Sequence, residues 1–332
     1  MGAFGRNHAR VYHSLQATGG VRLVGVVDSQ TARADAVARE FGCKSFGSVE
    51  QMLTTHSEVQ ATSVAVPTVL HLEVARTLIE SGVDVLIEKP VSATLAEADE
   101  LARLAVEHKR VLQVGHLERF NPAVRATLPL VTRPMFFEVH RLSVFSPRAL
   151  DVDVVLDLMI HDLDIVLTFA KSPVKEIRAV GLPILSGKVD IANVRAEFES
   201  GCVANFTASR VSTERVRKLR FFQPGQYISI DYGRQDVLVF SVDGKASSSP
   251  EPASRAAQEA GLPQPSVNPP IQVTKPAVTA EEPLLAEIKA FLDSVRSRTT
   301  PMVSLEDGRR ALELGLAILA EIRGHAGRVL GA

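Results

Sequence analysis

The first third of the chain alternates short apolar runs with amphipathic segments. The apolar runs have the composition of buried strands, and the segments between them repeat apolar residues at helical spacing. This alternation predicts parallel βαβ units with a ligand at the carboxyl ends of the strands. The predicted strands are 21–28, a segment around Phe46, 61–67, 83–90 and 110–116. The predicted helices are 6–15, 31–42, one beginning at Ser48, 68–82 and 95–109.

After Leu117 the pattern changes to one helix, a strand, a second helix and then a run of strands with tight turns. Asn121 and Pro122 begin the first helix as cap and first-turn residue. Consecutive strands with tight turns indicate an antiparallel sheet. The predicted helices are 117–128 and 151–169, and the predicted strands are 135–145, 174–185, 189–200, 202–212, 216–225, 227–233 and 236–242.

The fold class predicted from these patterns is α/β plus α+β. Residues 1–117 form a Rossmann-type dinucleotide-binding domain with a parallel sheet. Residues 118–332 form a substrate-binding and catalytic domain with a large, mainly antiparallel open sheet and two amphipathic C-terminal helices. Residues 244–280 are rich in Pro, Ser and Ala without a sustained period, so this range is expected to be irregular or flexible.

The N-terminus predicts a phosphate-binding turn. Gly2 and Gly5, on either side of Phe4, match the last two glycines of G-x-G-x-x-G, and a helical run follows. Asp28 ends the next strand at the spacing of a ribose-binding carboxylate. This carboxylate would accept the adenosine 2′-OH and repel a 2′-phosphate, which favours NAD over NADP. The alternative is that Asp28 is a strand-end turn residue.

The first strand of the dinucleotide-binding fold is absent from the sequence, as is the first glycine of the fingerprint. In the strand order 3-2-1-4-5-6 that strand lies between the second and the fourth. We therefore expect these two strands to lack their shared neighbour, and the natural protein to begin upstream of Met1.

Composition and charge exclude several classes of protein. Apolar residues make up 45% of the 332 residues, charged residues 23%, and the net charge is −1. These values are typical of a soluble globular protein and give no preference for nucleic acid or a membrane. Cys43 and Cys202 are distant in sequence and form no metal-binding or redox motif, which favours reduced thiols in the cytoplasm.

The helix predicted over 151–169 carries ionisable side chains at helical spacing. Asp153, Asp157 and His161 are four residues apart, and Asp164 follows three residues later. Burying such groups in an apolar helix is costly unless a polar partner meets them, and a polyhydroxylated substrate is one such partner. We expect the side of this helix that carries the four groups to form one wall of the active site, the catalytic wall, facing the cofactor domain. The alternative is a solvated helix face, and no metal site is predicted.

Polar residues also follow three of the predicted parallel strands. Pro67 and Thr68 lie at the carboxyl end of 61–67, Glu88, Lys89 and Pro90 at that of 83–90, and Gly115 and His116 at that of 110–116. His71 lies in the first turn of the next helix, where it is either near the cofactor or on the surface. Arg119 follows the third strand, and Arg210 ends a strand of the second domain, where it could meet a phosphate.

These landmarks together resemble the Gfo/Idh/MocA family of nicotinamide-dependent sugar and polyol oxidoreductases across nearly the whole chain. The resemblance rests on GAFGRNHA at 2–9, VAVPTVLH at 64–71, IEKP at 87–90 and the D-x-x-x-H motif of Asp157 and His161. It implies that Lys89 and His161 are the catalytic pair, that Asp157 helps to hold the substrate, and that a cis peptide bond precedes Pro90. It also implies a homo-oligomer, since one face of a broad antiparallel sheet needs cover.

Segments 115–124, 151–166 and 187–211 resemble a subgroup of that family that oxidises the 3-hydroxyl of the nucleotide sugar UDP-N-acetylglucosamine to a ketone. The cofactor-binding residues expected are Gly2, Phe4, Gly5, Asp28, Pro67, Thr68, His71, Glu88 and Lys89. The substrate-binding residues expected are His116, Arg119, Asp157, His161 and Arg210.

The expected reaction moves hydride from a secondary alcohol to nicotinamide while a base takes the hydroxyl proton. An imidazole is the better acceptor at neutral pH, so His161 is assigned as the base and Lys89 as the group that stabilises the alkoxide. The two roles can also be exchanged. Two other functions stay open: a dehydrogenase for inositol or another polyol, and a non-catalytic dinucleotide-binding sensor.

Overall fold

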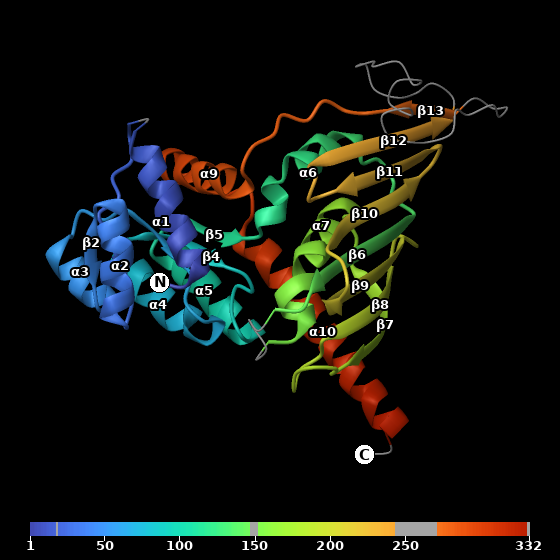
Figure 1. The fold of residues 1–332 in the computed structure, drawn as a ribbon, viewed down its shortest axis with the longest axis horizontal. Helices are drawn as coiled ribbons and strands as arrows, with labels where there is room; N and C mark the ends of the chain where they lie inside the picture. The colour runs from blue at the N-terminus through green and yellow to red at the C-terminus, as the bar shows by residue number, and fades with distance from the viewer. Residues whose placement is uncertain (18, 147–151, 243–270, 331–332) are drawn as a thin grey trace. The chain divides into compact units, whose positions relative to one another are not determined.

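The computed structural model describes residues 1–17, 19–146, 152–242 and 271–330. The chain forms two compact units (Figure 1). The first unit is Met1–Leu117 with Glu282–Leu312, and the second is Glu118–Glu281 with Glu313–Ala332. The boundary after Leu117 coincides with the change of sequence pattern.

Two parallel sheets occupy the first unit. β1 (Gly25–Val27) pairs with β2 (Lys44–Phe46), and β4 (Asp84–Glu88) lies between β3 (Ala61–Val64) and β5 (Leu112–Gly115). Among the described residues no pairing joins β1 to β3. The parallel βαβ topology is therefore confirmed. The division into two sheets agrees with the expectation that the second and fourth strands lack a shared neighbour.

Helices alternate with these strands, and sequence signals set their ends. Ser48 caps α3 by accepting the Gln51 N–H at 3.2 Å, and Thr94 and Glu97 form a capping box on α5. Gly42 ends α2 in the left-handed conformation. The helices are α1 (Ala3–Gln16), α2 (Thr31–Phe41), α3 (Val49–Thr55), the 3-10 turn η1 (Thr68–Leu70), α4 (His71–Glu80) and α5 (Leu95–Glu107).

The C-terminal helices differ from the domain expected for them. α9 (Pro283–Ser297) belongs to the first unit, where Ile288 and Phe291 pack against Val11 and Leu86. α10 (Leu305–Leu330) begins in the first unit and continues in the second. Amphipathic spacing shows that a helix has a buried face, but not which core receives that face.

An eight-stranded sheet forms the second unit, in the order β13-β12-β11-β10-β6-β9-β8-β7. Its pairs are antiparallel except β6 with β9, which are parallel. The strands are β6 (Phe136–Val144), β7 (Val174–Leu182), β8 (Ile191–Phe198), β9 (Val203–Ser212), β10 (Val216–Gln223), β11 (Gln226–Asp231), β12 (Asp236–Val242) and β13 (Ile271–Thr274). The predicted large, mainly antiparallel sheet is confirmed.

One strand corrects the expectation of irregular structure over 244–280. Ile271–Thr274 forms β13, which pairs with β12 at one edge of the sheet. Four residues are too short a run to show a strand period, so the tertiary pairing decides their conformation. Residues 275–280 are irregular, and 244–270 lie outside the described residues.

The core of the second unit lies between this sheet and the helices on one of its faces (Figure 1). α7 (Ile160–Ala170) and the later part of α10 contribute Leu163 and Ile318 to it, and β8 contributes alternate residues such as Val194. The short helices η2 (Leu117–Phe120), α6 (Pro122–Thr127) and η3 (Leu128–Leu130) precede β6. None of the helices in the described ranges has the length and apolarity needed to span a membrane.

Candidate functional site

The carboxyl ends of β3, β4 and β5 lie side by side in the first unit. Val64 pairs with Ile87, and Glu88 pairs with Gly115, in a parallel register. The segments that begin at Pro67, Lys89 and His116 leave the sheet just beyond these pairs. The prediction that they gather at one edge is therefore confirmed, and this is the edge where α/β sheets bind ligands.

Glu88 is held beside the backbone of its own strand and the next. Its Oε1 lies 2.9 Å from Nε2 of His8 on α1, and its Oε2 accepts the Lys89 N–H at 3.3 Å. A Cβ on Gly115 would come within 3.2 Å of Glu88 Cα, Cδ and Oε2. Glycine at position 115 therefore makes room for the carboxylate that precedes Lys89.

His71 is buried and contacts the segment after Lys89. Its Nδ1 lies 3.0 Å from the Pro90 carbonyl and 3.3 Å from the Val91 carbonyl, and its Nε2 lies 3.0 Å from the Val66 carbonyl. Burial lowers the pKa of His71 below its ordinary value of 6.5. The surface alternative is therefore wrong, because the buried imidazole contacts carbonyls that need a donor. A place near the cofactor stays a prediction. The Lys89–Pro90 peptide bond is cis, as the resemblance implies.

The glycine turn begins α1. Gly2 precedes the helix without a side-chain cap, and no atom lies within 4 Å of the position a Cβ would take there. Phe4 is exposed and Gly5 is buried. A helix start without a side-chain cap, and with space beside Gly2, suits a pyrophosphate. Asp28 pairs with the Met1 ammonium and accepts the Gln30 N–H at 2.8 Å, so the acid also has the turn role considered as its alternative.

Asp157 and His161 are half-buried on consecutive turns of the second unit. Asp157 lies in a π-helical turn, η4 (Val155–Met159), and His161 lies at the start of α7. A π-helical turn is rare, and such turns are frequent at functional sites. The motif predicted from D-x-x-x-H spacing thus lies on one irregular helical segment.

Asp153 and Asp164 have other partners, which corrects the expectation that both join the catalytic wall. Asp153 accepts the Val189 N–H at 2.9 Å. Asp164 is buried and accepts Nε and Nη2 of Arg119 at 2.7 and 3.0 Å. The π-helical turn has more residues per turn than an α-helix, so simple i, i+4 counting does not place all these groups on one side.

Two arginines expected to bind substrate contact protein groups. Arg119 forms the buried ion pair with Asp164. Arg210 donates to the Val152 carbonyl, and its Nε lies 3.6 Å from Asp190 Oδ1. Arg210 therefore connects the start of the helical segment to the loop before β8. His116 is buried at the end of β5.

A second buried ionic cluster escaped the sequence analysis. Arg141 donates to Asp162 at 2.6 and 3.0 Å and to Glu118 at 3.0 Å, and its guanidinium lies 5.2 Å from the centre of the Tyr232 ring. Burial raises the pKa of Asp162, and Arg141 opposes that rise. The signal was available, because strand alternation places Arg141 on the same inward face as Phe137 and Val139.

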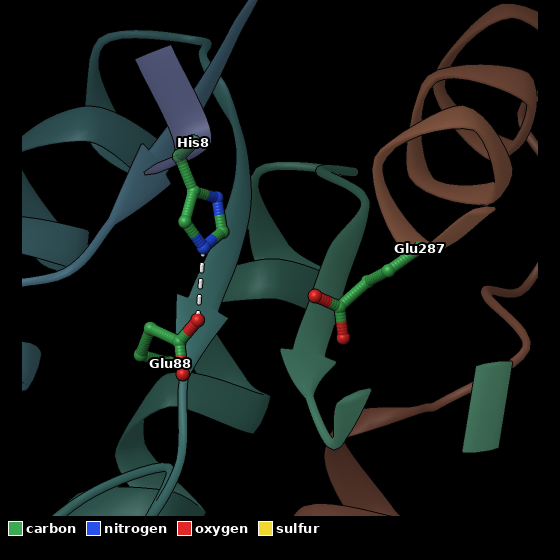
Figure 2. Close-up of side chains that lie close together, drawn as sticks. All are labelled: His8, Glu88 and Glu287. Atoms are coloured by element: carbon green, nitrogen blue, oxygen red, sulfur yellow. Dashed lines mark hydrogen bonds and ion pairs between the residues drawn. The ribbon is translucent and has the colours of Figure 1, made fainter. Parts of the chain in front are cut away.

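Glu287 of α9 is a further buried carboxylate that the sequence analysis missed. Figure 2 shows it pointing toward His8 and Glu88. One ligand atom from each of these three side chains lies within 4.8 Å of the other two. Burial and the nearby Glu88 raise the pKa of Glu287 well above its usual range. In the described part of the chain this is the one group with the composition and spacing of a metal site.

Comparison with known proteins gives the same division of the chain. The oxidoreductase family profile with an NAD-binding Rossmann fold, GFO/IDH/MocA, matches residues 1–116. The profile of the GFO/IDH/MocA C-terminal domain matches residues 134–223.

Two relatives match nearly the full chain. UDP-N-acetylglucosamine 3-dehydrogenase of Acidithiobacillus ferrooxidans is 33% identical, over 96% of this chain and 94% of the relative. The NAD-dependent scyllo-inositol 2-dehydrogenase of Bacillus subtilis is 24% identical, over 97% and 92% of the two chains.

Solved structures match as well. The structure of the Acidithiobacillus ferrooxidans enzyme superposes with a TM-score of 0.84 at 31% identity, covering 97% of this chain and 95% of that one. Levoglucosan dehydrogenase in complex with NADH and levoglucosan has a TM-score of 0.80 at 16% identity, with coverage of 97% and 95%. At that identity the second match shows the fold alone.

Proposed function

Since this chain belongs to the Gfo/Idh/MocA family of NAD-binding oxidoreductases, we propose that it oxidises the 3-hydroxyl of UDP-N-acetylglucosamine to a ketone, with NAD as the hydride acceptor. The family's members named here are dehydrogenases acting on sugar alcohols, and this chain is an NAD(P)-dependent dehydrogenase of CH–OH groups. The observation that carries the choice of substrate is the 33% identity to the nucleotide-sugar enzyme, sustained over 96% of the chain.

Lys89 is proposed to polarise the reacting alcohol. It directly follows the central strand of the three-stranded parallel sheet, where the nicotinamide end of a dinucleotide is expected. Glu88 accepts its backbone N–H, and His71 contacts the carbonyl of the next residue. These contacts fix the backbone on both sides of Lys89, and a fixed backbone favours preorganised stabilisation of a developing alkoxide.

His161 is proposed as the base that takes the hydroxyl proton, and Asp157 as a group that binds a substrate hydroxyl or orients the imidazole. Both are half-buried, so the protein leaves them partly accessible while Asp162 and Asp164 beside them are buried in ion pairs. NAD, when bound, accepts the hydride at its nicotinamide ring.

The uncapped start of α1 supports a dinucleotide as the cofactor, with its pyrophosphate at Gly2, Phe4 and Gly5. Asp28 is proposed to discriminate between cofactors, because a carboxylate repels the 2′-phosphate of NADP. The acid lies at the end of β1 and is half-buried. We therefore expect reduction of NAD to be faster than reduction of NADP.

The test is the rate of NADH formation, followed by absorbance, with UDP-N-acetylglucosamine, other UDP-sugars and scyllo-inositol. We expect turnover of UDP-N-acetylglucosamine and a loss of about 10²–10⁴-fold in kcat for Lys89→Ala and for His161→Ala. The matched controls Lys175→Ala and His13→Ala change exposed residues and should retain wild-type rates. Undiminished turnover in both site variants would refute the assignment.

A polyol dehydrogenase is the second candidate, favoured by the full-length match to the inositol enzyme. Turnover of scyllo-inositol without turnover of any UDP-sugar would select it. Tight NAD binding without turnover of any alcohol in the panel would instead favour a dinucleotide sensor.

A homo-oligomer is proposed from the outer face of the large sheet. Rings of Phe136, Phe222, Tyr227 and Phe240 form a continuous row over four strands, with neighbouring centroids 5.7, 4.9 and 5.2 Å apart. Phe222 is 39% exposed. A contiguous aromatic row of this kind is typical of an interface. Light scattering after gel filtration should give a mass of at least twice the 35.9 kDa of one chain, and a mass of one chain would contradict the proposal.

A further inference from the structure

Three side chains from separate elements of the first unit meet around one point. His8 comes from the middle of α1, Glu88 from the end of β4 and Glu287 from α9 (Figure 2). His8 Nε2 lies 2.9 Å from Glu88 Oε1, and the three ligand atoms lie within 4.8 Å of one another.

Two members of the cluster are buried and Glu88 is half-buried, and Glu287 has no hydrogen-bond partner among the described residues. Glu287 is 0% exposed and His8 is 3% exposed. Among the described residues neither carboxylate oxygen of Glu287 has a hydrogen-bond partner, and neither does Nδ1 of His8. Buried polar atoms in native proteins are almost always satisfied, so Glu287 indicates a missing group.

A proton alone accounts poorly for this arrangement. Protonation would neutralise Glu287 but would not by itself add a partner, and neither of its oxygens has a hydrogen-bond partner among the described residues. The His8–Glu88 contact leaves at most one positive charge beside two carboxylates. A divalent cation would balance both carboxylates and give each of them a ligand bond.

We propose that His8, Glu88 and Glu287 bind one divalent transition-metal ion of the Zn²⁺ or Mn²⁺ type. An imidazole nitrogen with two carboxylate oxygens suits these ions, whereas Mg²⁺ and Ca²⁺ prefer oxygen ligands alone. Ligand bonds of about 2.1 Å allow donor atoms up to about 4.2 Å apart, so small side-chain movements bring the group to ligand distances.

The proposed ion joins α1, β4 and α9. It also fixes Glu88, whose other oxygen accepts the Lys89 N–H. The ion is therefore a structural element of the dinucleotide-binding unit, placed beside the segment that carries Lys89. This goes beyond the proposed dehydrogenase activity and does not depend on its substrate.

The experiment measures Mn²⁺ binding by electron paramagnetic resonance, in which free Mn²⁺ gives the strong signal. Full-length protein is first dialysed against a chelator and then against buffer, and the titration contains no NAD and no sugar. We expect one Mn²⁺ per chain, displaced by Zn²⁺, and a rise in Tm on adding either ion.

Glu287→Gln keeps the shape of the side chain and removes its charge, and His8→Gln removes the imidazole. Each variant should bind Mn²⁺ at least tenfold more weakly, because even changes to outer-shell residues cost about 10–100-fold in metal affinity. The control Glu282→Gln makes the same change at an exposed position beside the start of α9, and should bind as the wild type does.

Absence of stoichiometric Mn²⁺ or Zn²⁺ binding by the folded wild-type protein would overturn the proposal. So would a stoichiometric ion that binds equally well to both variants, since that ion would lie elsewhere. Circular dichroism identifies a variant that does not fold, and the other variant then decides. Because no substrate is present, failure of the dehydrogenase assay leaves this result unaffected.

Discussion

Two buried ionic clusters in this protein differ in how their charges are balanced. In the second unit, Arg141 lies between Asp162 and Glu118, and each of these carboxylates receives hydrogen bonds from it. In the first unit, Glu287 lies near Glu88 and His8 without a hydrogen bond to either among the described residues. Both clusters contain buried carboxylates, but only in the first does every carboxylate oxygen have a hydrogen-bond partner among the described residues.

By this difference we distinguish Arg141, Asp162 and Glu118, which stabilise the fold, from His8, Glu88 and Glu287, the proposed metal ligands. The hydrogen bonds of a fully paired buried charge offset the cost of removing it from water. If one partner is removed, the other stays buried and that cost is no longer offset. For a buried carboxyl group without a partner, such as Glu287, that cost is already part of the stability of the wild-type protein. Substitutions in the two clusters should therefore have different consequences for stability.

The largest effect is expected for Arg141→Met. Methionine has a similar length but leaves Asp162 and Glu118 buried without their cation, which should lower the free energy of unfolding by about 3–5 kcal/mol. Urea denaturation measures the change. The control Arg220→Met removes an arginine from the partly exposed pair with Glu138 and should change stability by less than about 1 kcal/mol. Equal losses of unfolding free energy in the two variants would show that the buried Arg141 cluster contributes no more to stability than a partly exposed ion pair.

His71→Gln tests a buried group whose partners are all backbone carbonyls. Glutamine cannot reach both sides, so we expect a loss of about 1–3 kcal/mol at pH 8. The pKa of His71 is lowered by burial, so the unfolded chain takes up the proton first, and wild-type stability falls as the pH drops below 6.5.

The variant lacks that histidine, so the difference in free energy of unfolding between the variant and the wild type should be smaller at pH 5 than at pH 8. Urea denaturation at both pH values measures it. A gap of constant size would contradict the assigned cause.

Glu287→Gln should have the smallest effect on stability in chelator-treated protein, within about 1 kcal/mol of the wild type. The substitution replaces a buried carboxyl group that has no hydrogen-bond partner among the described residues, so it leaves no other group newly unsatisfied. The same urea experiment measures this change. A loss as large as that expected for Arg141→Met would mean that Glu287 already has a strong partner, and the comparison between the clusters would fail.

Much of the fold could be predicted from the chain because the local patterns were strong. Alternating apolar runs and amphipathic segments identified the parallel βαβ unit, and the helix beginning at Ser48 was predicted correctly. β13 could not be found, because a four-residue strand depends on its neighbour. The unit to which α9 belongs could not be predicted either, because an apolar helix face does not show which of the two cores it packs against.

For the candidate site, the sequence located residues but not their partners. It brought Pro67, Lys89 and His116 to the carboxyl ends of adjacent strands, because parallel topology requires it. It did not predict that Arg119 pairs with Asp164 or that Arg210 lies near Asp190, because ion-pair partners distant in the sequence leave no local pattern. Whether either arginine also contacts substrate stays a prediction. The catalytic roles of Lys89, His161 and Asp157 stay predictions for the kinetic experiments above.

The sequence by itself determined the class of domain, the strand ends and the residues able to take part in chemistry. It could do so because hydrophobic periodicity, helix caps and glycines act locally. The tertiary structure alone decided which ionisable groups are satisfied. Hydrogen bonding and desolvation depend on groups far apart in the chain, such as Arg141 with Asp162, or Glu287 with His8. The same carboxylate is a structural ion-pair partner or a candidate ligand according to the atoms that surround it.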